Sequence, residues 1–179
     1  MSARAAASGD GAASSHPASS DRVGEVGVGE VGVGEVRVGV VGELDPTVLF
    51  GILRLRVDVF VVEQQCPYPD LDGRDVEPGA RMLWLERGGE VVATARLLRE
   101  PDGAARIGRV VTAPAWRGRG LAATLIRRAL ELSAGRAAVL DAQSHWEHWY
   151  QRFGFVRDGA EFVEDGIPHV PMRRAGRVT

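Results

Sequence analysis

The most informative segment of the chain reads Val110-Val111-Thr112-Ala113-Pro114-Ala115-Trp116-Arg117-Gly118-Arg119-Gly120-Leu121-Ala122. It begins with the β-branched residues of a strand and continues, after Gly120, as an amphipathic helix. Helix N-termini expose unpaired N–H groups and a partial positive charge, and glycines let an anion approach the backbone closely. Arg117 and Arg119 add two cations to the same turn. The segment therefore predicts a site for a diphosphate at a strand-to-helix turn.

Two better-known phosphate motifs do not fit this turn. It lacks the Gly-Lys-Ser/Thr of a P-loop, its glycine spacing is not that of the dinucleotide fingerprint, and no strand–helix–strand unit follows it. An ordinary strand-to-helix connection with solubilising arginines is the alternative to an anion site. The segment alone leaves both interpretations open.

Strand and helix patterns lie on both sides of the turn. Asp45 is a favourable N-cap, Pro46 suits the first helical position, and apolar residues at helical spacing continue to about Gln64. A second helix is predicted from about Gly118 to Ser133. The remaining patterns predict one short helix, His145–Arg152, and the strands Arg81–Arg87, Glu90–Arg99, Ala105–Thr112, Ala137–Ala142, Phe155–Phe162 and Ile167–Arg173. This order predicts a mixed α/β (α+β) domain with an antiparallel meander.

The N-terminal residues differ in composition from the rest of the chain. Met1–Arg22 is rich in Ala, Ser, Gly and Asp, and a five-residue Val-Gly-Glu repeat then runs from Val23 to Arg37. A period of five matches neither a strand nor a helix. We expect residues 1–34 to be a disordered low-complexity tail, with a β segment or a partner-binding arm as the alternative. The folded domain is expected over residues 35–179, opening with a strand between Glu35 and Val41.

Composition excludes several classes of protein. With 22 Lys+Arg against 24 Asp+Glu in 179 residues, the net charge of −2 argues against bulk attraction to nucleic acid or to a membrane. Cys66 is the only cysteine, which excludes an intrachain disulfide and a cysteine zinc cage. The sequence has no apolar run of ~18 residues and no signal-peptide core, so we expect a cytoplasmic protein.

The turn also resembles a known signature. Arg117-x-x-Gly120-x-Ala122, after a strand that ends near Thr112, is similar to the acyl-CoA signature of the GNAT N-acetyltransferase superfamily. The resemblance covers residues 35–173 and implies the GNAT fold, a central mixed, mostly antiparallel sheet flanked by helices. Four further blocks resemble the ElaA-type subgroup: Val59-Phe60-Val61-Val62-Glu63-Gln64, Pro67-Tyr68-x-Asp70-x-Asp72, Ala142-Gln143-x-His145 and Glu164-Asp165-Gly166-Ile167-Pro168-His169.

This resemblance implies acetyl-CoA as the acyl donor. In the family, the loop amides hold the pyrophosphate, and the backbone of the preceding strand hydrogen-bonds the pantetheine arm. By position, the strand role falls to Val110, Val111 and Thr112, and the loop role falls to Arg117, Gly118, Arg119, Gly120, Leu121 and Ala122. We expect a backbone N–H near Val111 to meet the oxyanion.

Acyl transfer from a thioester to an amine needs a neutral nucleophile and a protonated leaving thiol. Tyr150 matches the family's tyrosine near the coenzyme sulfur and is the expected general acid, with a purely structural aromatic role as the alternative. The candidates for the general base are Glu63, His145 and His169. Each of these three could instead have only a structural hydrogen-bonding role. The resemblance also allows a backbone carbonyl of the separated strands to polarise the amine in place of a side-chain base.

Two metal sites are weaker alternatives. His145, His148 and His169 would supply three nitrogens to an open zinc site, and the acidic loop from Asp70 to Arg81 has part of a calcium-loop pattern. No carboxylate spacing supports the first, and the second has its glycine early and lacks the final Glu, so we expect no metal. The same loop could attract a cationic amine or simply carry solvated charges.

The motifs together predict an enzyme that transfers an acetyl group from acetyl-CoA to an amine by direct attack in a ternary complex. A catalytically inactive CoA-binding regulatory module is the alternative. We expect a small-molecule or peptide amine as the acceptor, and no nucleic-acid or membrane partner. The identity of the acceptor, the acyl-chain length of the donor and the oligomeric state are left open by the sequence.

Overall fold

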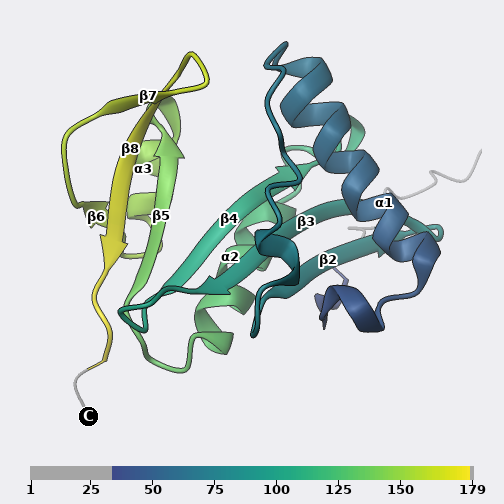
Figure 1. The fold of residues 1–179 in the computed structure, drawn as a ribbon, viewed down its shortest axis with the longest axis horizontal. Helices are drawn as coiled ribbons and strands as arrows, with labels where there is room; N and C mark the ends of the chain where they lie inside the picture. The colour runs from purple at the N-terminus through teal and green to yellow at the C-terminus, as the bar shows by residue number, and fades with distance from the viewer. Residues whose placement is uncertain (1–33, 178–179) are drawn as a thin grey trace, which may run out of the picture. The chain divides into compact units, whose positions relative to one another are not determined.

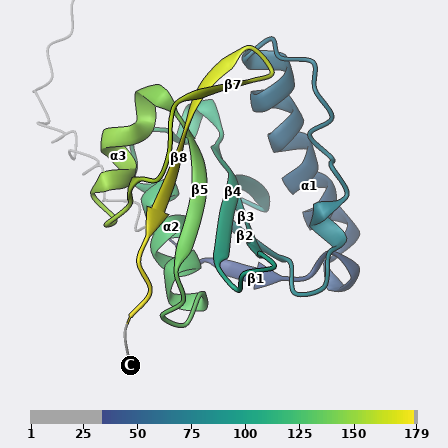
Figure 2. The same cartoon turned by 60° about the vertical axis from the view of Figure 1, so that its left-hand side comes forward.

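The structure is a computed structural model that describes residues 34–177 (Figure 1). Its centre is an eight-stranded sheet in the order β1-β2-β3-β4-β5-β8-β6, with β7 paired to β8. Helix α1 (Pro46–Arg56) lies on one face, and α2 (Leu121–Leu132) and α3 (Glu147–Gln151) lie on the other (Figure 2). The strands are β1 (Arg37–Gly39), β2 (Arg81–Arg87), β3 (Glu90–Arg99), β4 (Ala105–Thr112), β5 (Ala138–Gln143), β6 (Val156–Arg157), β7 (Phe162–Glu164) and β8 (Ile167–Arg174).

This architecture confirms the expected mixed, mostly antiparallel sheet flanked by helices. Among the described strands, β4 and β5 form the one parallel pair, and every other pair is antiparallel. The predictions for residues 1–33 fall outside the described part of the chain. The expected first strand is shorter than predicted, because the backbone turns into a 3-10 segment, η1 (Val41–Glu43), after β1.

Strands β2, β3 and β4 match their predicted ranges residue for residue. The turn between β2 and β3 is made by Gly88 and Gly89, whose φ angles of 57° and 82° suit the two central positions of a tight hairpin. The inward-facing residues of β2, β3 and β4 pack against α2 in the main core, where Leu85, Leu125 and Ile126 are fully buried. The meander therefore packs with α2 into the main core.

Helix α1 begins and continues as the sequence predicts, but its last turns are wider than an α-helix. The Asp45 Oδ1 atom accepts the N–H of Thr47 at 2.8 Å, and Pro46 occupies the first position. A π-helical segment, η2 (Val57–Glu63), follows α1 directly. Such segments are rare and are frequent at functional sites. Glu63 is the last residue of η2, so the wider turns set the direction in which its side chain leaves the helix.

The prediction of one continuous strand over Phe155–Phe162 is wrong, because its middle residues are not in a strand. It is split into β6 and β7, which pair with opposite ends of β8. The Asp158 N–H still donates to the Pro171 carbonyl at 2.8 Å, but Pro171 has no N–H to continue the ladder. A Cβ on Gly159 would also lie 2.8 Å from the Pro171 ring. Pro171 therefore ends the pairing after β6.

Arg56 is a cation inside the protein, with only 1% of its surface exposed. Its Nε donates to Asp70 at 2.8 Å, its Nη1 donates to Asp75 at 2.8 Å, and its Nη2 donates to the Asp70 carbonyl at 2.9 Å. Arg96 of β3 contacts the same Asp75 at 3.1 Å and holds Asp72 through two bonds of 2.7 and 2.8 Å. These ion pairs bind the acidic loop to α1 and to the sheet.

The loop's carboxylates are consequently internal partners of arginines. Burial opposes the ionisation of Asp72, yet hydrogen bonds from Arg96 and from the Arg74 backbone lower its pKa to about 2. A carboxyl with a lowered pKa stabilises the fold above its ordinary pKa and loses that contribution as the pH falls toward 2. The solvated-charge interpretation of this loop is wrong for Asp70 and Asp75, which are buried.

We predict that Arg56→Ala lowers the free energy of unfolding by about 3 kcal/mol, because it leaves buried carboxylates without their main cation. The lower end of the usual range applies, since Arg96 still contacts Asp75. Urea denaturation measures the change. Arg54→Ala, on the exposed side of the same helix, is the control and should stay within about 0.5 kcal/mol of the parent. Equal unfolding midpoints for the two variants would show that the buried ion pairs contribute nothing net.

Candidate active site

Strands β4 and β5 separate along their length. They pair only at Ala105 with Ala138 and at Arg106 with Val139, near the beginning of each strand. Beyond these pairs the two strands diverge, as Figure 1 shows. From Ile107 to Thr112, the backbone groups on one edge of β4 therefore have no partner on β5.

A bulge in β4 sets the direction of these free groups. Arg109 has a φ of 51°, and the pairing with β3 shifts register between Thr94 and Arg96. After the bulge, the Ala113 N–H donates to Val92 of β3 at 2.9 Å. Because backbone groups alternate along an antiparallel pair, those of Val110 and Thr112 point into the split, and those of Val111 point toward β3. Val110 and Thr112 thus suit the strand role better than Val111 does.

The Arg109 side chain holds the bulge to the acidic loop. It forms ion pairs of 2.7 Å with Asp70 and 3.1 Å with Asp72, and it lies over the Tyr68 ring at 5.4 Å. Tyr68 in turn donates to Asp70 at 2.8 Å. These ion pairs argue against the alternative in which Asp70 and Asp72 attract a cationic acceptor, because arginines already pair with both carboxylates.

The glycine turn after β4 presents a row of free amides. A 3-10 turn, η4 (Pro114–Trp116), leads into Gly118 and Gly120, whose φ angles of 75° and 78° suit glycine. Helix α2 therefore begins at Leu121 and not at the predicted Gly118. Within residues 34–177, no acceptor receives the N–H of Gly118, Arg119, Gly120, Leu121 or Ala122. Five successive unpaired donors at a helix N-terminus form a site that favours an anion.

The two arginines of the turn behave differently. Arg117 turns back, so that its Nη2 donates to Glu63 at 2.7 Å and its Nε donates to the Thr112 carbonyl at 3.2 Å. Arg119 lies over the Trp116 ring at 4.8 Å and, among the described residues, has no ion pair. The hydrogen bond from Arg117 lowers the pKa of the Glu63 carboxyl. Two predicted site residues, Glu63 and Arg117, are thus brought into direct contact.

Tyr150 lies on α3, on the same face of the sheet as α2 (Figure 2). Its ring packs edge-on against Trp149 at 4.8 Å and Phe155 at 6.1 Å. Burial raises the pKa of the Tyr150 hydroxyl to about 12. Within the described part of the chain, the hydroxyl has no hydrogen-bond partner. Tyr150 therefore has both a fixed ring and a free donor.

His169 lies on the opposite face. It pairs in register with Gln143, the last residue of β5, and Gln143 donates to Gln64 at 3.2 Å. The His169 ring stacks on Phe162, and its Nδ1 lies 2.8 Å from the Ile167 carbonyl. A carbonyl only accepts, so Nδ1 carries the proton and the Nε2 lone pair is free. His145, by contrast, is exposed beside Trp146.

Comparison with known proteins agrees with this geometry. A model described as "Acetyltransferase (GNAT) domain" matches residues 55–175. The chain belongs to the GNAT family. A Mycobacterium tuberculosis protein designated UPF0039 is 49% identical to it over 138 residues, or 75% of this chain and 88% of that protein. Escherichia coli ElaA is 39% identical over 138 residues, or 74% of this chain and 90% of ElaA.

Solved structures show the same relationship. An acyl-CoA N-acyltransferase from Pseudomonas aeruginosa superposes with a TM-score of 0.75 at 39% identity, covering 79% of this chain and 99% of that one. The crystal structure of Escherichia coli ElaA gives a TM-score of 0.73 at 37% identity, covering 78% and 98%. The predicted resemblance to the ElaA-type GNAT proteins is thereby confirmed. The fold is that of acyltransferases that use an acyl-CoA donor.

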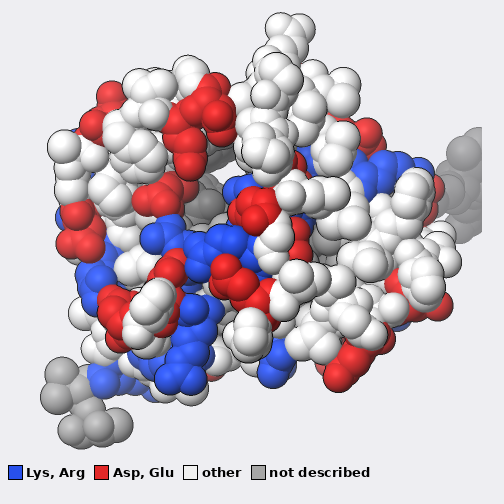
Figure 3. Space-filling model, viewed as in Figure 1, with Lys and Arg blue, Asp and Glu red and all other residues white. Residues whose placement is uncertain are grey.

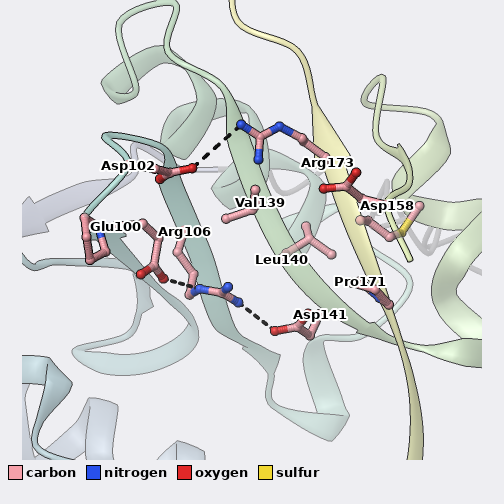
Figure 4. Close-up of a pocket in the computed structure, with 11 residues that line it drawn as sticks. Glu100, Asp102, Arg106, Val139, Leu140, Asp141, Asp158, Pro171 and Arg173 are labelled. Atoms are coloured by element: carbon pink, nitrogen blue, oxygen red, sulfur yellow. Dashed lines mark hydrogen bonds and ion pairs between the residues drawn. The ribbon is translucent and has the colours of Figure 1, made fainter. Parts of the chain in front are cut away.

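Two other surface features of this GNAT domain lie outside the split between β4 and β5. On the face that carries α1, acidic and basic side chains are interleaved (Figure 3). A groove of about 400 Å³ opens where β4 and β5 still pair, and Arg106 donates there to Asp141 at 2.6 Å and pairs with Glu100 (Figure 4). Arg106 lies about 20 Å along β4 from Thr112, so this groove is separate from the glycine turn.

The described residues offer neither a cluster of metal ligands nor a helix that could span a membrane. Over residues 34–177, no three His, Cys, Asp or Glu side chains gather as a metal-ligand group, and His148 instead contacts Gln151 at 3.0 Å. No helix in this range is both long and apolar enough to cross a membrane. Cys66 is buried, and its thiol donates to the Asp165 carbonyl at 3.3 Å, tying the loop after η2 to the β7–β8 turn.

Three structural features around the candidate site were not predicted from the sequence: a hydrogen bond, a set of ion pairs and a bulge. Gln64 and Gln143 stand in the quoted blocks, but nothing in those blocks indicates that they hydrogen-bond to each other. Arg109 lies 39 residues from Asp70, and ion pairs at that separation have no local pattern. The one sequence signal for the bulge at Arg109 is the interrupted alternation of apolar and polar residues along β4.

Proposed function

We propose that this GNAT protein transfers an acetyl group from acetyl-CoA to an amine by direct attack in a ternary complex. The observation that carries the proposal is the row of five unpaired amides, Gly118 to Ala122, placed where β4 has separated from β5. A diphosphate would satisfy these donors and the positive end of α2 together. The acceptor is a small-molecule or peptide amine.

The end of β4 fits the pantetheine arm of the donor. The arm carries amides, and the backbone groups of Val110 and the N–H of Thr112 could pair with them as a neighbouring strand does. The Thr112 carbonyl is already held by the Arg117 side chain. The Thr112 Oγ1 atom is buried and has no hydrogen-bond partner among the described residues. A buried hydroxyl without a partner is costly, and a bound amide would relieve that cost. The thioester would then lie in the split between the strands.

The two faces of the sheet suit the two halves of the reaction. His169, with its free Nε2, lies on the α1 face, and Tyr150, with its free hydroxyl, lies on the α2 face. An amine that enters from the α1 face would attack the carbonyl while the sulfur leaves toward Tyr150. The neutral amine nitrogen forms the new C–N bond and loses one proton to the base. The electron pair of the broken C–S bond stays on the sulfur, which leaves as a thiolate and takes its proton from solvent.

His169 is the base in this proposal. A lysine-like amine costs about 4.6 kcal/mol to deprotonate at pH 7, and an α-amine about 1.4 kcal/mol, so proton removal is a substantial step. The pKa of Glu63 is lowered by Arg117, which makes this carboxylate a weaker base. His145 faces solvent. His169 supports this role by combining a defined tautomer with a register position opposite Gln143, at the end of β5.

Tyr150 stabilises the leaving sulfur. A phenol with a pKa of about 12 stays protonated at neutral pH. Complete transfer of its proton to a free thiolate of pKa ~8.5 would be uphill by about 5 kcal/mol. Tyr150 therefore acts mainly as a hydrogen-bond donor to the developing thiolate, which is the form of acid assistance that its environment favours.

We predict that Gly120→Glu weakens acetyl-CoA binding at least about 100-fold, because it places a carboxylate among amides that favour an anion. Isothermal calorimetry measures the affinity. Gly79→Glu is the control: Gly79 also has a positive φ, of 85°, and open space around it, so the backbone strain is similar. Equal affinities for both variants, or a parent protein without a thermal shift in millimolar acetyl-CoA, would remove the coenzyme site. Binding without thiol release from any amine class would favour the inactive regulatory module.

We predict that Tyr150→Phe lowers turnover about 100-fold and leaves coenzyme affinity unchanged. Because the pKa of Tyr150 is about 12, the rate of the parent should show no loss from deprotonation of this group up to pH 10. Thiol-release kinetics across pH measure both effects. Loss of binding with normal turnover per bound complex would make Tyr150 a structural residue.

We predict that His169→Asn also lowers turnover about 100-fold at saturating acetyl-CoA, because the amide offers no basic nitrogen. His148→Asn is the matched control, since His148 is exposed on α3 and its ring contacts Gln151, away from the split. If His145→Asn lowers turnover and His169→Asn does not, His145 is the base.

A further inference from the structure

The Arg117 side chain joins three parts of the site. Its Nε donates to the carbonyl of Thr112 at the end of β4, and its Nη2 donates to Glu63 at the end of η2. Arg117 itself is the residue before the first glycine of the turn. One guanidinium thus links the end of β4, the glycine turn and the helical segment on the α1 face.

The backbone of the turn has few restraints of its own. The Arg117 N–H donates weakly to Pro114 at 3.3 Å, and the next backbone bond along the described chain is from Thr124 to Gly120 at 3.0 Å. Between these bonds stand Gly118 and Gly120, whose hypothetical Cβ atoms would meet nothing within 4 Å. Glycines without neighbouring contacts have wide conformational freedom. Besides the contact of Arg119 with the Trp116 ring, the Arg117 side chain is therefore the last described restraint before the free amides.

Glu63 is well placed to hold Arg117. Its own backbone is fixed in η2, where Gln64 donates to Val59 at 3.1 Å and Val59 is buried. Its carboxylate lies 2.7 Å from Arg117, and the pair leaves 42% of the Glu63 side chain and 45% of the Arg117 side chain exposed. An ion pair this exposed contributes little to stability, so its main effect is geometric.

We propose that Glu63 is a positioning residue that, through Arg117, holds the glycine turn in the conformation that binds the coenzyme. The proposal rests on the proposed function, because it names how the same coenzyme site is organised. It assigns the phosphate contacts to the free amides and to Arg119, which makes no ion pair within residues 34–177. It also connects the segment on the α1 face to the affinity for the donor.

A double-mutant cycle on acetyl-CoA affinity tests this role. Glu63→Ala is expected to weaken binding about 10-fold in the parent and by less than about twofold in an Arg117→Ala background, because the two residues act as one unit. Glu63→Gln, which keeps an acceptor but loses the charge, should recover part of the affinity. The control is Glu131→Ala, which removes a comparably exposed ion pair with Arg128 on α2, away from the turn, and should leave affinity unchanged.

Kinetics separate this role from that of a base. At saturating acetyl-CoA, turnover of Glu63→Ala should stay within about threefold of the parent, so that the change appears in KM for the donor. A large loss of turnover in Glu63→Gln with unchanged affinity would make Glu63 a base and overturn the proposal. Full additivity in the cycle, or unchanged affinity in Glu63→Ala, would also overturn it. If the parent protein itself fails to bind acetyl-CoA, the proposed function fails, which is a different result from failure of the cycle.

Discussion

A buried cation determines how the catalytic half of this protein is assembled. Arg56 leaves α1 toward the interior and donates three hydrogen bonds, to the Asp70 and Asp75 side chains and to the Asp70 carbonyl. Such a cation is stable inside a protein only when its donors are satisfied. The acidic loop meets that requirement, and its own carboxylates are satisfied in return by Arg96 and Arg109. The loop, α1, β3 and β4 are thus fixed together by a single set of mutually neutralising charges.

The geometry of the site follows from that assembly. Because Arg109 is held by Asp70 and Asp72, the bulge in β4 has a definite position, and the residues after it face the split. The split exists because β5 pairs with β4 over only two residues. One strand therefore has two functions: its β3 edge belongs to the antiparallel meander, and its other edge offers hydrogen-bonding groups to a ligand. A coenzyme bound there would replace the missing part of the sheet.

Local patterns predicted much of this fold. Strands β2 to β4 were predicted residue for residue, because their apolar residues and the turns between them are encoded by neighbours in sequence. The coenzyme turn was also predictable, since glycines, arginines and a helix start lie within a few residues. The ion pairs were not, because Arg56 and Asp75 or Glu63 and Arg117 are 19 and 54 residues apart. The split of the strand after Phe155 depends on Pro171 in a different strand, which no local pattern reveals.

The buried Cys66 thiol has a consequence for the chemistry proposed here. Every cycle of acyl transfer would release coenzyme A as a free thiol beside the protein. Mixed disulfides form when an accessible thiolate meets an oxidised partner. Cys66 is the only cysteine of the chain, is 6% exposed and donates a hydrogen bond to the Asp165 carbonyl. Oxidised coenzyme would therefore find no accessible sulfur on the folded chain with which to form a mixed disulfide.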